Sequence, residues 1–216
     1  MRYKHTDTIH ADMALRSQAI LSRLSDFAAV PRGLWFYELA YCLLTPQSSA
    51  RNASLAVDEL MARRFFERGD DPTPVLRDRR HYIRFHNTKA RRLQEARMTF
   101  PLLLAELDRS RKHPDALALD GCILRDWLLA NVRGLGWKEA SHFLRNIGYR
   151  NLAILDRHIL RNLKYHGVIG TVPKALTPKR YLAIEQSFLK FGNAIGIPMD
   201  ELDLLFWSRD TGEIRK

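Results

Sequence analysis

A glycine-rich turn between two apolar helical segments constrains this chain more than any other feature. Apolar residues recur at helical spacing over residues 123–128 and again over 143–147, and Gly134-Leu135-Gly136 lies between them. Glycine permits the positive φ angles of a tight turn and lets a ligand approach the backbone closely. A helix that begins directly after such a turn exposes free N–H groups and the positive end of its dipole. The stretch therefore predicts two helices joined by a turn that suits a phosphate group.

Lys138 and Asp156 stand at positions where ionisable side chains have chemical consequences. Lys138 falls in the first turn of the second predicted helix, where a cation opposes the helix dipole. Asp156 comes eighteen residues later, directly after the apolar pair Ile154-Leu155 and at the start of a further helical segment. A lysine that only binds phosphate is the alternative interpretation of Lys138, and a plain N-cap is the alternative for Asp156.

The charge balance points to a polyanionic partner. The 216 residues carry a formal net charge of +11, and between Arg77 and Arg97 eight Lys/Arg residues face only two acids. This concentration predicts a basic surface for nucleic acid. An Arg-rich composition with a solvated helix face remains the alternative. The DNA contacts that we expect from this segment are Arg84, Lys89, Arg91 and Arg92.

Cysteine usage and the absence of long apolar runs limit the class of protein. The two cysteines, Cys42 and Cys122, lie in apolar runs and are too few for the four thiolates of an iron–sulfur cluster. Residues 1–12 contain no apolar leader, and no apolar run approaches the roughly 18 residues of a membrane helix. We expect reduced thiols, no metal and an intracellular, cytoplasmic protein that does not contact membranes.

Periodicity predicts an all-α fold, with no convincing strand and no internal repeat. We expect helices over 8–28 and 34–44, over 87–98 and 99–111 as two separate helices, and over 178–191 and 199–209. The residues that signal helix starts are Ser48 or Ser49, Thr73-Pro74, Asn87, Thr99 with Pro101, Asp120, Thr177-Pro178 and Pro198.

The sequence around the turn resembles that of one branch of the helix-hairpin-helix DNA glycosylase (endonuclease III) superfamily. This branch is the type-2 8-oxoguanine DNA glycosylase/lyases. Four sequence motifs carry the resemblance: Gly-Leu-Gly-Trp-Lys from Gly134, Ile-Leu-Asp-Arg-His from Ile154, Leu-Thr-Pro-Gln-Ser from Leu44 and Phe-His-Asn-Thr-Lys from Phe85. The resemblance implies a barrel lobe over 32–150, with the hairpin at about 123–147, and a second lobe that joins 1–31 to 151–216. It places the active site in the cleft between the lobes, without an iron–sulfur cluster.

The resemblance also implies a reaction. Lys138 would attack C1′ of a flipped nucleotide, release 8-oxoguanine, and form a Schiff base that permits β-elimination at the 3′ phosphate. An ordinary lysine is almost wholly protonated at pH 7, with about one molecule in 2,500 neutral. A helix N-terminus and burial in a cleft both favour the neutral amine. Asp156 would accept the amine proton or stabilise positive charge at the sugar.

Further residues take roles by the same resemblance. His158, Gly134 and Gly136 would contact DNA phosphates, with a monovalent cation among the hairpin carbonyls as a further candidate ligand. Gln47 would fill the gap left by the flipped base. Trp207 would stack on the extruded purine, with Lys216 in the base pocket and Phe85 as a second stacking candidate. Ordinary packing, capping or solvation is the alternative for each of these residues.

Two classes of function stay open on the sequence alone. The first is a bifunctional glycosylase/lyase acting on double-stranded DNA that contains 8-oxoguanine, and on abasic-site DNA, as a nucleoid-associated monomer without a cofactor. A lyase specific for oxidised pyrimidines is a variant of it. The second is a non-catalytic hairpin module that binds DNA and needs neither Lys138 nor Asp156.

Overall fold

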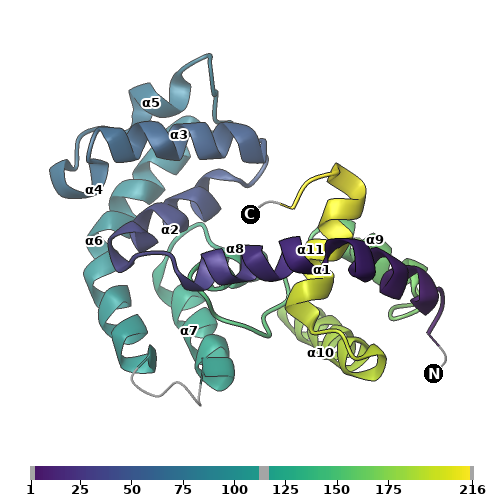
Figure 1. Ribbon diagram of the computed structural model, residues 1–216. Helices are drawn as coiled ribbons and strands as arrows, with labels where there is room; N and C mark the ends of the chain where they lie inside the picture. The colour runs from purple at the N-terminus through teal and green to yellow at the C-terminus, as the bar shows by residue number, and fades with distance from the viewer. Residues whose placement is uncertain (1–2, 112–116, 215–216) are drawn as a thin grey trace. The chain divides into compact units, whose positions relative to one another are not determined.

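The computed structural model describes residues 3–111 and 117–214, and the regular secondary structure in that part of the chain is helical (Figure 1). It contains no strand among the described residues, so the all-α prediction is confirmed. The helices are α1 (Thr6–Ala28), the short 3₁₀ helix η1 (Arg32–Leu34), α2 (Trp35–Leu44), α3 (Ala50–Ala62), α4 (Phe65–Arg68), α5 (Thr73–Arg77), α6 (His86–Arg111), α7 (Leu117–Asn131), α8 (Trp137–Asn146), α9 (Arg157–Tyr165), α10 (Pro178–Ile195) and α11 (Met199–Thr211). None of these helices combines the length and the apolarity needed to span a bilayer.

The chain divides into two compact units. One unit comprises Val30–Phe143, and the other joins Met1–Ala29 to Leu144–Lys216. The boundary at Phe143 falls inside α8, and Lys138 lies on the Val30–Phe143 side. The assignment of the lobes 32–150 and 1–31 plus 151–216 to the two walls of an active-site cleft stays a proposal.

Helix α2 is the core of the Val30–Phe143 unit. All ten of its residues are buried, because α3 and α6 pack against it. An aromatic cluster around Phe36 fills the space between α2, α4 and α6, with Phe65, Phe66 and Phe100 at centroid distances of 6.0, 4.7 and 5.4 Å. Burial of several large aromatic side chains supplies much of the stabilising free energy of such a unit.

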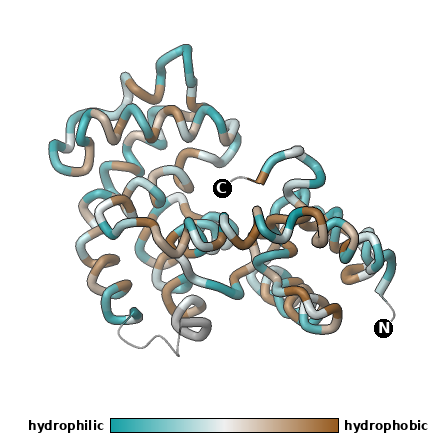
Figure 2. Tube along the Cα trace, in the orientation of Figure 1, coloured by the Kyte–Doolittle hydropathy of each residue, from teal (hydrophilic) through white to brown (hydrophobic). Residues whose placement is uncertain are grey.

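Helix α3 shows how local sequence sets the helix boundaries. The Ser49 hydroxyl accepts a hydrogen bond from Asn52 N at 3.0 Å, which is the N-cap that the sequence predicted. Its apolar stripe, Ala53, Ala56, Val57 and Leu60, is buried, and Figure 2 shows apolar and polar residues alternating along the helix. The stripe packs α3 against α2.

Helix α6 corrects the prediction of two helices that meet near Met98. It is continuous from His86 to Arg111, and Pro101 lies inside it. The Thr99 hydroxyl, expected to cap a new helix, instead donates to Glu95 O one turn back. The buried positions Phe100, Leu103 and Leu107 continue one apolar face through the proline. Tertiary burial of that face outweighs the roughly 3 kcal/mol that proline costs in a helix interior.

Three more predicted helix starts were wrong. Asn87, expected to cap a helix, is already the second residue of α6. The other two are Thr73 and Asp120. Thr73 does not cap α5, since it is the first helical residue and its N–H and hydroxyl both donate to Asp71 Oδ1, at 2.9 and 2.7 Å. These bonds, the hydroxyl bond first, lower the pKa of Asp71. Asp120 does not begin α7, because that helix already starts at Leu117. All three errors arise because short polar residues are common within first turns as well as before them.

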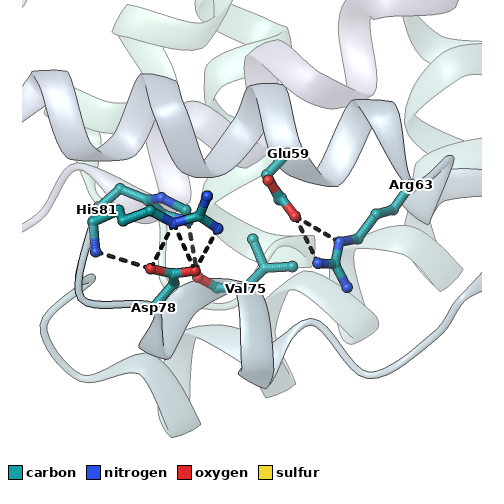
Figure 3. Close-up of polar contacts among 6 residues, drawn as sticks. Glu59, Arg63, Val75, Asp78 and His81 are labelled. Carbon is teal, nitrogen blue, oxygen red and sulfur yellow. Dashed lines mark hydrogen bonds and ion pairs between the residues drawn. The ribbon is translucent and has the colours of Figure 1, made fainter.

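The loop after α5 is closed by local polar contacts (Figure 3). His81 is buried, and its Nε2 lies 3.0 Å from Val75 O, while Asp78 accepts hydrogen bonds from the backbone and guanidinium of Arg80. The Arg80 bonds hold the pKa of Asp78 well below its usual range. The charge of Arg80 is therefore partly offset by the Asp78 carboxylate. Glu59 of α3 and Arg63, the residue directly after this helix, form a separate i,i+4 ion pair.

Helix α11 is the core of the other unit and packs against α1, α9 and α10. Arg209 of α11 binds Asp12 Oδ2 at 2.5 Å and Thr8 O at 3.0 Å, which fixes α1 against α11. His166, at the end of α9, is fully buried and stacks on Phe206 with ring centroids 5.3 Å apart. Its two ring nitrogens contact Lys4 O and the Arg209 guanidinium, so the N-terminal segment is held to the same core.

Candidate active site and nucleic-acid interface

The hairpin between α7 and α8 is a tight turn that requires glycine at one position. Gly134 has a φ of +94°, a region that side chains rarely adopt. A Cβ there would also lie 2.4 Å from Cδ of Arg92, whose side chain covers the turn. Gly136 immediately precedes α8, and its carbonyl accepts the first bond of that helix from Ala140 N at 2.9 Å. The sequence prediction of two helices joined at these glycines is confirmed.

Lys138 is the second residue of α8, so the predicted first-turn position is correct. Its side chain is 34% exposed, and Nζ lies 3.5 Å from Oε1 of Glu139, an acid in the same first turn. The Glu139 carboxylate also lies over Gly136, where a Cβ would be 2.9 Å from Oε2. An acid suits the positive end of the helix and offsets the charge of Lys138. Sequence reasoning missed Glu139, although its place three residues after Gly136 is that of a capping-box acid.

Asp156 is the N-cap of α9 and uses one oxygen for that purpose. Its Oδ1 accepts hydrogen bonds from His158 N at 2.7 Å and Ile159 N at 2.9 Å. Within the part of the chain that the structure describes, Oδ2 has no hydrogen-bond partner. Asp156 therefore does cap α9, as the alternative interpretation expected. The cap leaves one carboxylate oxygen free for chemistry. Lys138 and Asp156 belong to different units, and their pairing in one active site stays a prediction.

The segment before Asp156 is held by buried polar side chains that sequence reasoning missed. Residues 152–155 are buried and non-helical, so their backbone groups need partners from elsewhere. Glu185 Oε2 accepts from Ala153 N at 2.8 Å, and Tyr181 OH donates to Ala153 O at 2.5 Å. Asp200 accepts from Asn151 N, and burial raises its pKa. Only a buried extended run followed by a cap, as in Leu152–Asp156, would have hinted at such support.

His158 lies in the first turn of α9, and its orientation is set by Asp210. Nδ1 of His158 is 2.5 Å from Asp210 Oδ2. The two side chains line a shallow pocket with Arg161, Asn162 and Tyr165. Only a doubly protonated ring can donate through Nδ1 to the carboxylate and through Nε2 to a phosphate, because Nε2 of the neutral Nδ1–H form is an acceptor.

One predicted DNA contact, Lys89, is wrong. Lys89 is 2% exposed, and its Nζ donates to Leu44 O and Pro46 O, each at 2.6 Å, and to Ser48 Oγ at 3.2 Å. A side chain enclosed in this way cannot reach a DNA phosphate. Burial, followed by the positive charge of Arg92, lowers the pKa of Lys89 to about 8. Charge counting failed here because it cannot tell a lysine on a solvated face from one that points into the unit.

Two arginines of α6, Arg91 and Arg92, lie close to the hairpin and its residue Arg133. Arg92 packs over Gly134, and Arg91 and Arg133 lie 3.8 and 3.7 Å from the same Glu95 oxygen. Arg91 and Arg133 are 71% and 82% exposed, so both can reach a phosphate. We call Arg91, Arg92 and Arg133 the hairpin arginines. Arg133 was missed by sequence reasoning, although it directly precedes Gly134.

Gln47, Arg84 and Phe85 lie on two turns that the structure joins. Residues 45–48 form the Gln47 turn, closed by Ser48 N to Thr45 O at 3.0 Å, and residues 82–85 form the Phe85 turn. Arg84 N donates to Ser48 Oγ at 3.1 Å and connects them. Gln47, Arg84 and Phe85 are all exposed, and the Arg84 guanidinium lies 5.0 Å from the centre of the Phe85 ring.

Comparison with known proteins assigns the chain to a family. The model of a family described as "8-oxoguanine DNA glycosylase" matches residues 20–197. The chain belongs to this family.

Relatives of the glycosylase family align with most of the chain. A protein of Fusobacterium nucleatum named 8-oxoguanine DNA glycosylase/AP lyase is 40% identical over 187 residues, which cover 83% of this chain and 81% of the relative. The protein of Korarchaeum cryptofilum with the same name is 38% identical, with 84% and 82% covered.

Solved structures agree with the sequence relatives. The 8-oxoguanine DNA glycosylase of Thermotoga maritima matches with a TM-score of 0.82 and 30% identity, covering 98% of each chain. The Methanocaldococcus jannaschii 8-oxoguanine glycosylase/lyase, in complex with a 15mer DNA that contains 8-oxoguanine, matches with a TM-score of 0.77 and 28% identity, covering 97% and 100%. The predicted helix-hairpin-helix glycosylase fold is confirmed.

The base-recognition residues expected from the family lie near the end of the chain. Trp207 of α11 is half-buried, and its carbonyl accepts from the Thr211 hydroxyl, so the last turn is well formed. Lys216 lies outside the described residues. Trp207 and Phe85 belong to different units, and their action on one base stays a prediction.

Metal binding finds no support in the described residues. They contain no group of three or more His, Cys, Asp or Glu residues that could hold a metal ion. The whole sequence has two cysteines, too few for a four-thiolate cluster. The absence of a cofactor and the monovalent cation at the hairpin stay predictions.

Proposed function

We propose that this chain excises 8-oxoguanine from double-stranded DNA and then cleaves the strand at the resulting abasic site. The observation that carries the proposal is the 40% identity over 187 residues with a protein named 8-oxoguanine DNA glycosylase/AP lyase. The likeness to a glycosylase/lyase bound to DNA containing 8-oxoguanine supports the same substrate. The chain is then a DNA N-glycosylase with abasic-site lyase activity.

Lys138 is the nucleophile in this proposal. Its ammonium leaves the Glu139 carboxylate and gives up one proton, and the free amine attacks C1′ while the bond from C1′ to the base breaks. The base departs with the electron pair of that bond and takes up a second proton from the amine. The C1′–O4′ bond of the sugar then breaks, O4′ takes the electron pair and the proton first given up, and a protonated imine remains between Nζ and C1′. The resulting imine makes the C2′ proton acidic, so that proton is lost and the bond to the 3′ phosphate breaks. The place of Lys138 at the start of α8, directly after the hairpin, supports this role.

Asp156 supports the reaction through its free oxygen. While Oδ1 caps α9, Oδ2 accepts the amine proton or stabilises the positive charge that develops at the sugar. A charge of this kind is most useful when it faces the transition state rather than the bound substrate.

The DNA backbone is bound by the hairpin N–H groups and by charge. Gly134 and Gly136 let phosphates approach the turn, and the hairpin arginines, Arg84 and His158 add cationic or N–H donors. We assign no metal or organic cofactor to the reaction, with a monovalent cation at the hairpin carbonyls as the one ion allowed. Chromosomal DNA as substrate places a monomeric protein inside the cell, in the cytoplasm at the nucleoid.

Recognition of the base is assigned to side chains near the expected cleft. Gln47 fills the gap in the duplex, Trp207 and Phe85 stack on the extruded purine, and Lys216 completes the pocket. Stacking of this kind is worth about 1–3 kcal/mol per base.

The direct test uses a duplex with one 8-oxoguanine opposite cytosine. The wild-type protein should release free 8-oxoguanine and yield a strand break without alkali. A break that appears only after alkali would contradict the lyase step. DNA binding without any base release would leave a non-catalytic hairpin module, and release of oxidised pyrimidines but not 8-oxoguanine would overturn the assigned substrate.

A further inference from the structure

Lys89 is a buried cation with all three of its N–H donors engaged. An ammonium group offers three donors and no acceptor, and here they meet Leu44 O, Pro46 O and Ser48 Oγ. Leu44 is the last residue of α2, so one of these bonds satisfies a carbonyl that the helix itself leaves open. A lysine with this degree of burial is rare in a protein and is buried only when its charge is paired or hydrogen-bonded.

The contacts of Lys89 join the Gln47 turn to the Phe85 turn. Pro46 O and Ser48 Oγ belong to the first turn, and the same Ser48 Oγ accepts Arg84 N from the second. The backbone N–H of Lys89 donates to Phe85 O at 3.0 Å. Both turns are therefore fastened to the first turns of α6 through one residue.

Each turn presents an exposed side chain from a strained backbone. Gln47 has a φ of +57° and Phe85 a φ of +59°, and neither is a glycine. A non-glycine residue in this region costs about 1–3 kcal/mol and persists only where its surroundings hold it. In the Gln47 turn, Pro46 followed by a positive φ is the pattern of a type II turn, which favours glycine or asparagine at the position of Gln47.

We propose that Lys89 is a positioning residue that holds Gln47, braced by the Phe85 turn, in the conformation with which Gln47 enters the DNA duplex when the damaged base is extruded. This inference rests on the proposed function. A side chain that replaces a base in a stack contributes more binding energy if it is already ordered, because ordering it on binding costs free energy. The hydrogen bonds that converge on Lys89 and Ser48 supply that order, because they hold the strained backbone conformations of Gln47 and Phe85. Lys89 itself, being enclosed, touches neither base nor phosphate.

The test compares Lys89→Met with wild type on two substrates in single-turnover reactions. One substrate carries 8-oxoguanine paired with cytosine in a duplex, and the other carries it as an unpaired single-nucleotide bulge. We expect Lys89→Met to slow excision from the paired duplex by about 100-fold and from the bulge by less than about threefold, since misplacement of groups that act only on the paired lesion is felt only there. Equal slowing on both substrates would overturn the proposal. A wild-type protein inactive on both would instead contradict the proposed function.

Two further variants separate positioning from loss of stability. Leu107→Ala removes a fully buried side chain eighteen residues further along α6 and should lower the melting temperature while leaving the ratio of the two rates at the wild-type value. Ser48→Ala removes the shared acceptor and should shift the ratio in the same direction as Lys89→Met. In the Lys89→Met background, Gln47→Ala should cause no additional loss on the paired duplex. A full additional loss would show that Gln47 acts independently of Lys89 and would overturn the proposal.

Discussion

Asp156 is a helix cap to which we assign a second, catalytic role. Oδ1 closes the open end of α9 with two backbone hydrogen bonds, and the proposed catalytic role falls to Oδ2. The cap fixes the orientation of the carboxylate, so it would also hold Oδ2 in place for the proposed reaction.

Replacement of Asp156 by Asn separates these roles. Asparagine is as good an N-cap as aspartate, so Asp156→Asn should keep its melting temperature and its affinity for DNA. Loss of the charge should reduce the single-turnover rate of 8-oxoguanine excision by about 10²–10⁴-fold. A rate near the wild-type value would reduce Asp156 to a helix cap.

Burial of His166 should make the free energy of unfolding depend on pH. Burial lowers its pKa, and its contacts suit the neutral ring, with Nδ1 donating to Lys4 O and Nε2 accepting from Arg209 Nη1. Because the unfolded chain binds the proton more readily, the free energy of unfolding should fall as the pH drops below about 6.5.

Chemical denaturation at pH 7.0 and 5.5 measures this effect. His166→Asn, whose amide can still donate to Lys4 O, should be less stable than wild type at pH 7.0 and should lose less further stability at pH 5.5. An equal loss in both proteins would assign the acid sensitivity to other groups.

At the scale of helices, the sequence predicts the helix caps and turns that depend on neighbouring residues alone. The cap at Ser49, the cap at Asp156 and the glycine turn at Gly134 all follow from short-range hydrogen bonding and backbone sterics. Burial of Lys89 could not be predicted, because it depends on where α2 ends relative to α6, and the continuity of α6 through Pro101 depends on its buried face. The hydrogen bond from Tyr181 OH to Ala153 O could not be predicted either, because the two residues lie 28 positions apart in the sequence.

The segment that leads into Asp156 provides a prediction at this scale. Tyr181→Phe removes the hydroxyl that donates to Ala153 O, and an unpaired buried carbonyl costs about 1–3 kcal/mol. We expect a lower melting temperature and, well below it, a single-turnover rate reduced about tenfold or more, because Asp156 is no longer held in place. DNA affinity should stay unchanged.

Tyr165→Phe is the matched control for this prediction. Tyr165 is 55% exposed, so the same change of one hydroxyl should leave the melting temperature at the wild-type value. A Tyr181→Phe enzyme with wild-type turnover would show that the segment holds Asp156 without Tyr181.

The whole molecule carries a net charge of +11, but only part of that charge lies on free side chains that could bind DNA. Lys89 is enclosed, Arg80 is bound to Asp78, and Arg97 donates to Phe66 O and Glu67 O. The basic surface is therefore smaller than the charge count of residues 77–97 predicts, and it includes Arg133 from the hairpin.

Salt dependence measures the basic surface. Each DNA phosphate that the protein no longer neutralises lowers the slope of log K against log salt by about 0.9. Changing Arg91 and Arg92 together to Ala should reduce the slope for undamaged duplex by about one to two units. Arg63→Ala, which removes an arginine already paired with Glu59, should leave the slope as it is. An unchanged slope in the double variant would place the DNA footprint elsewhere.

Covalent capture by borohydride tests the central claim most directly, because borohydride reduces the imine between the protein and C1′ of the damaged nucleotide. With a duplex containing 8-oxoguanine opposite cytosine, wild type and Lys179→Gln, a change at an exposed lysine of α10, should both form the adduct. Lys138→Gln should bind the same duplex and form none. Capture of Lys138→Gln as efficient as that of wild type would contradict the assignment of Lys138 as the nucleophile.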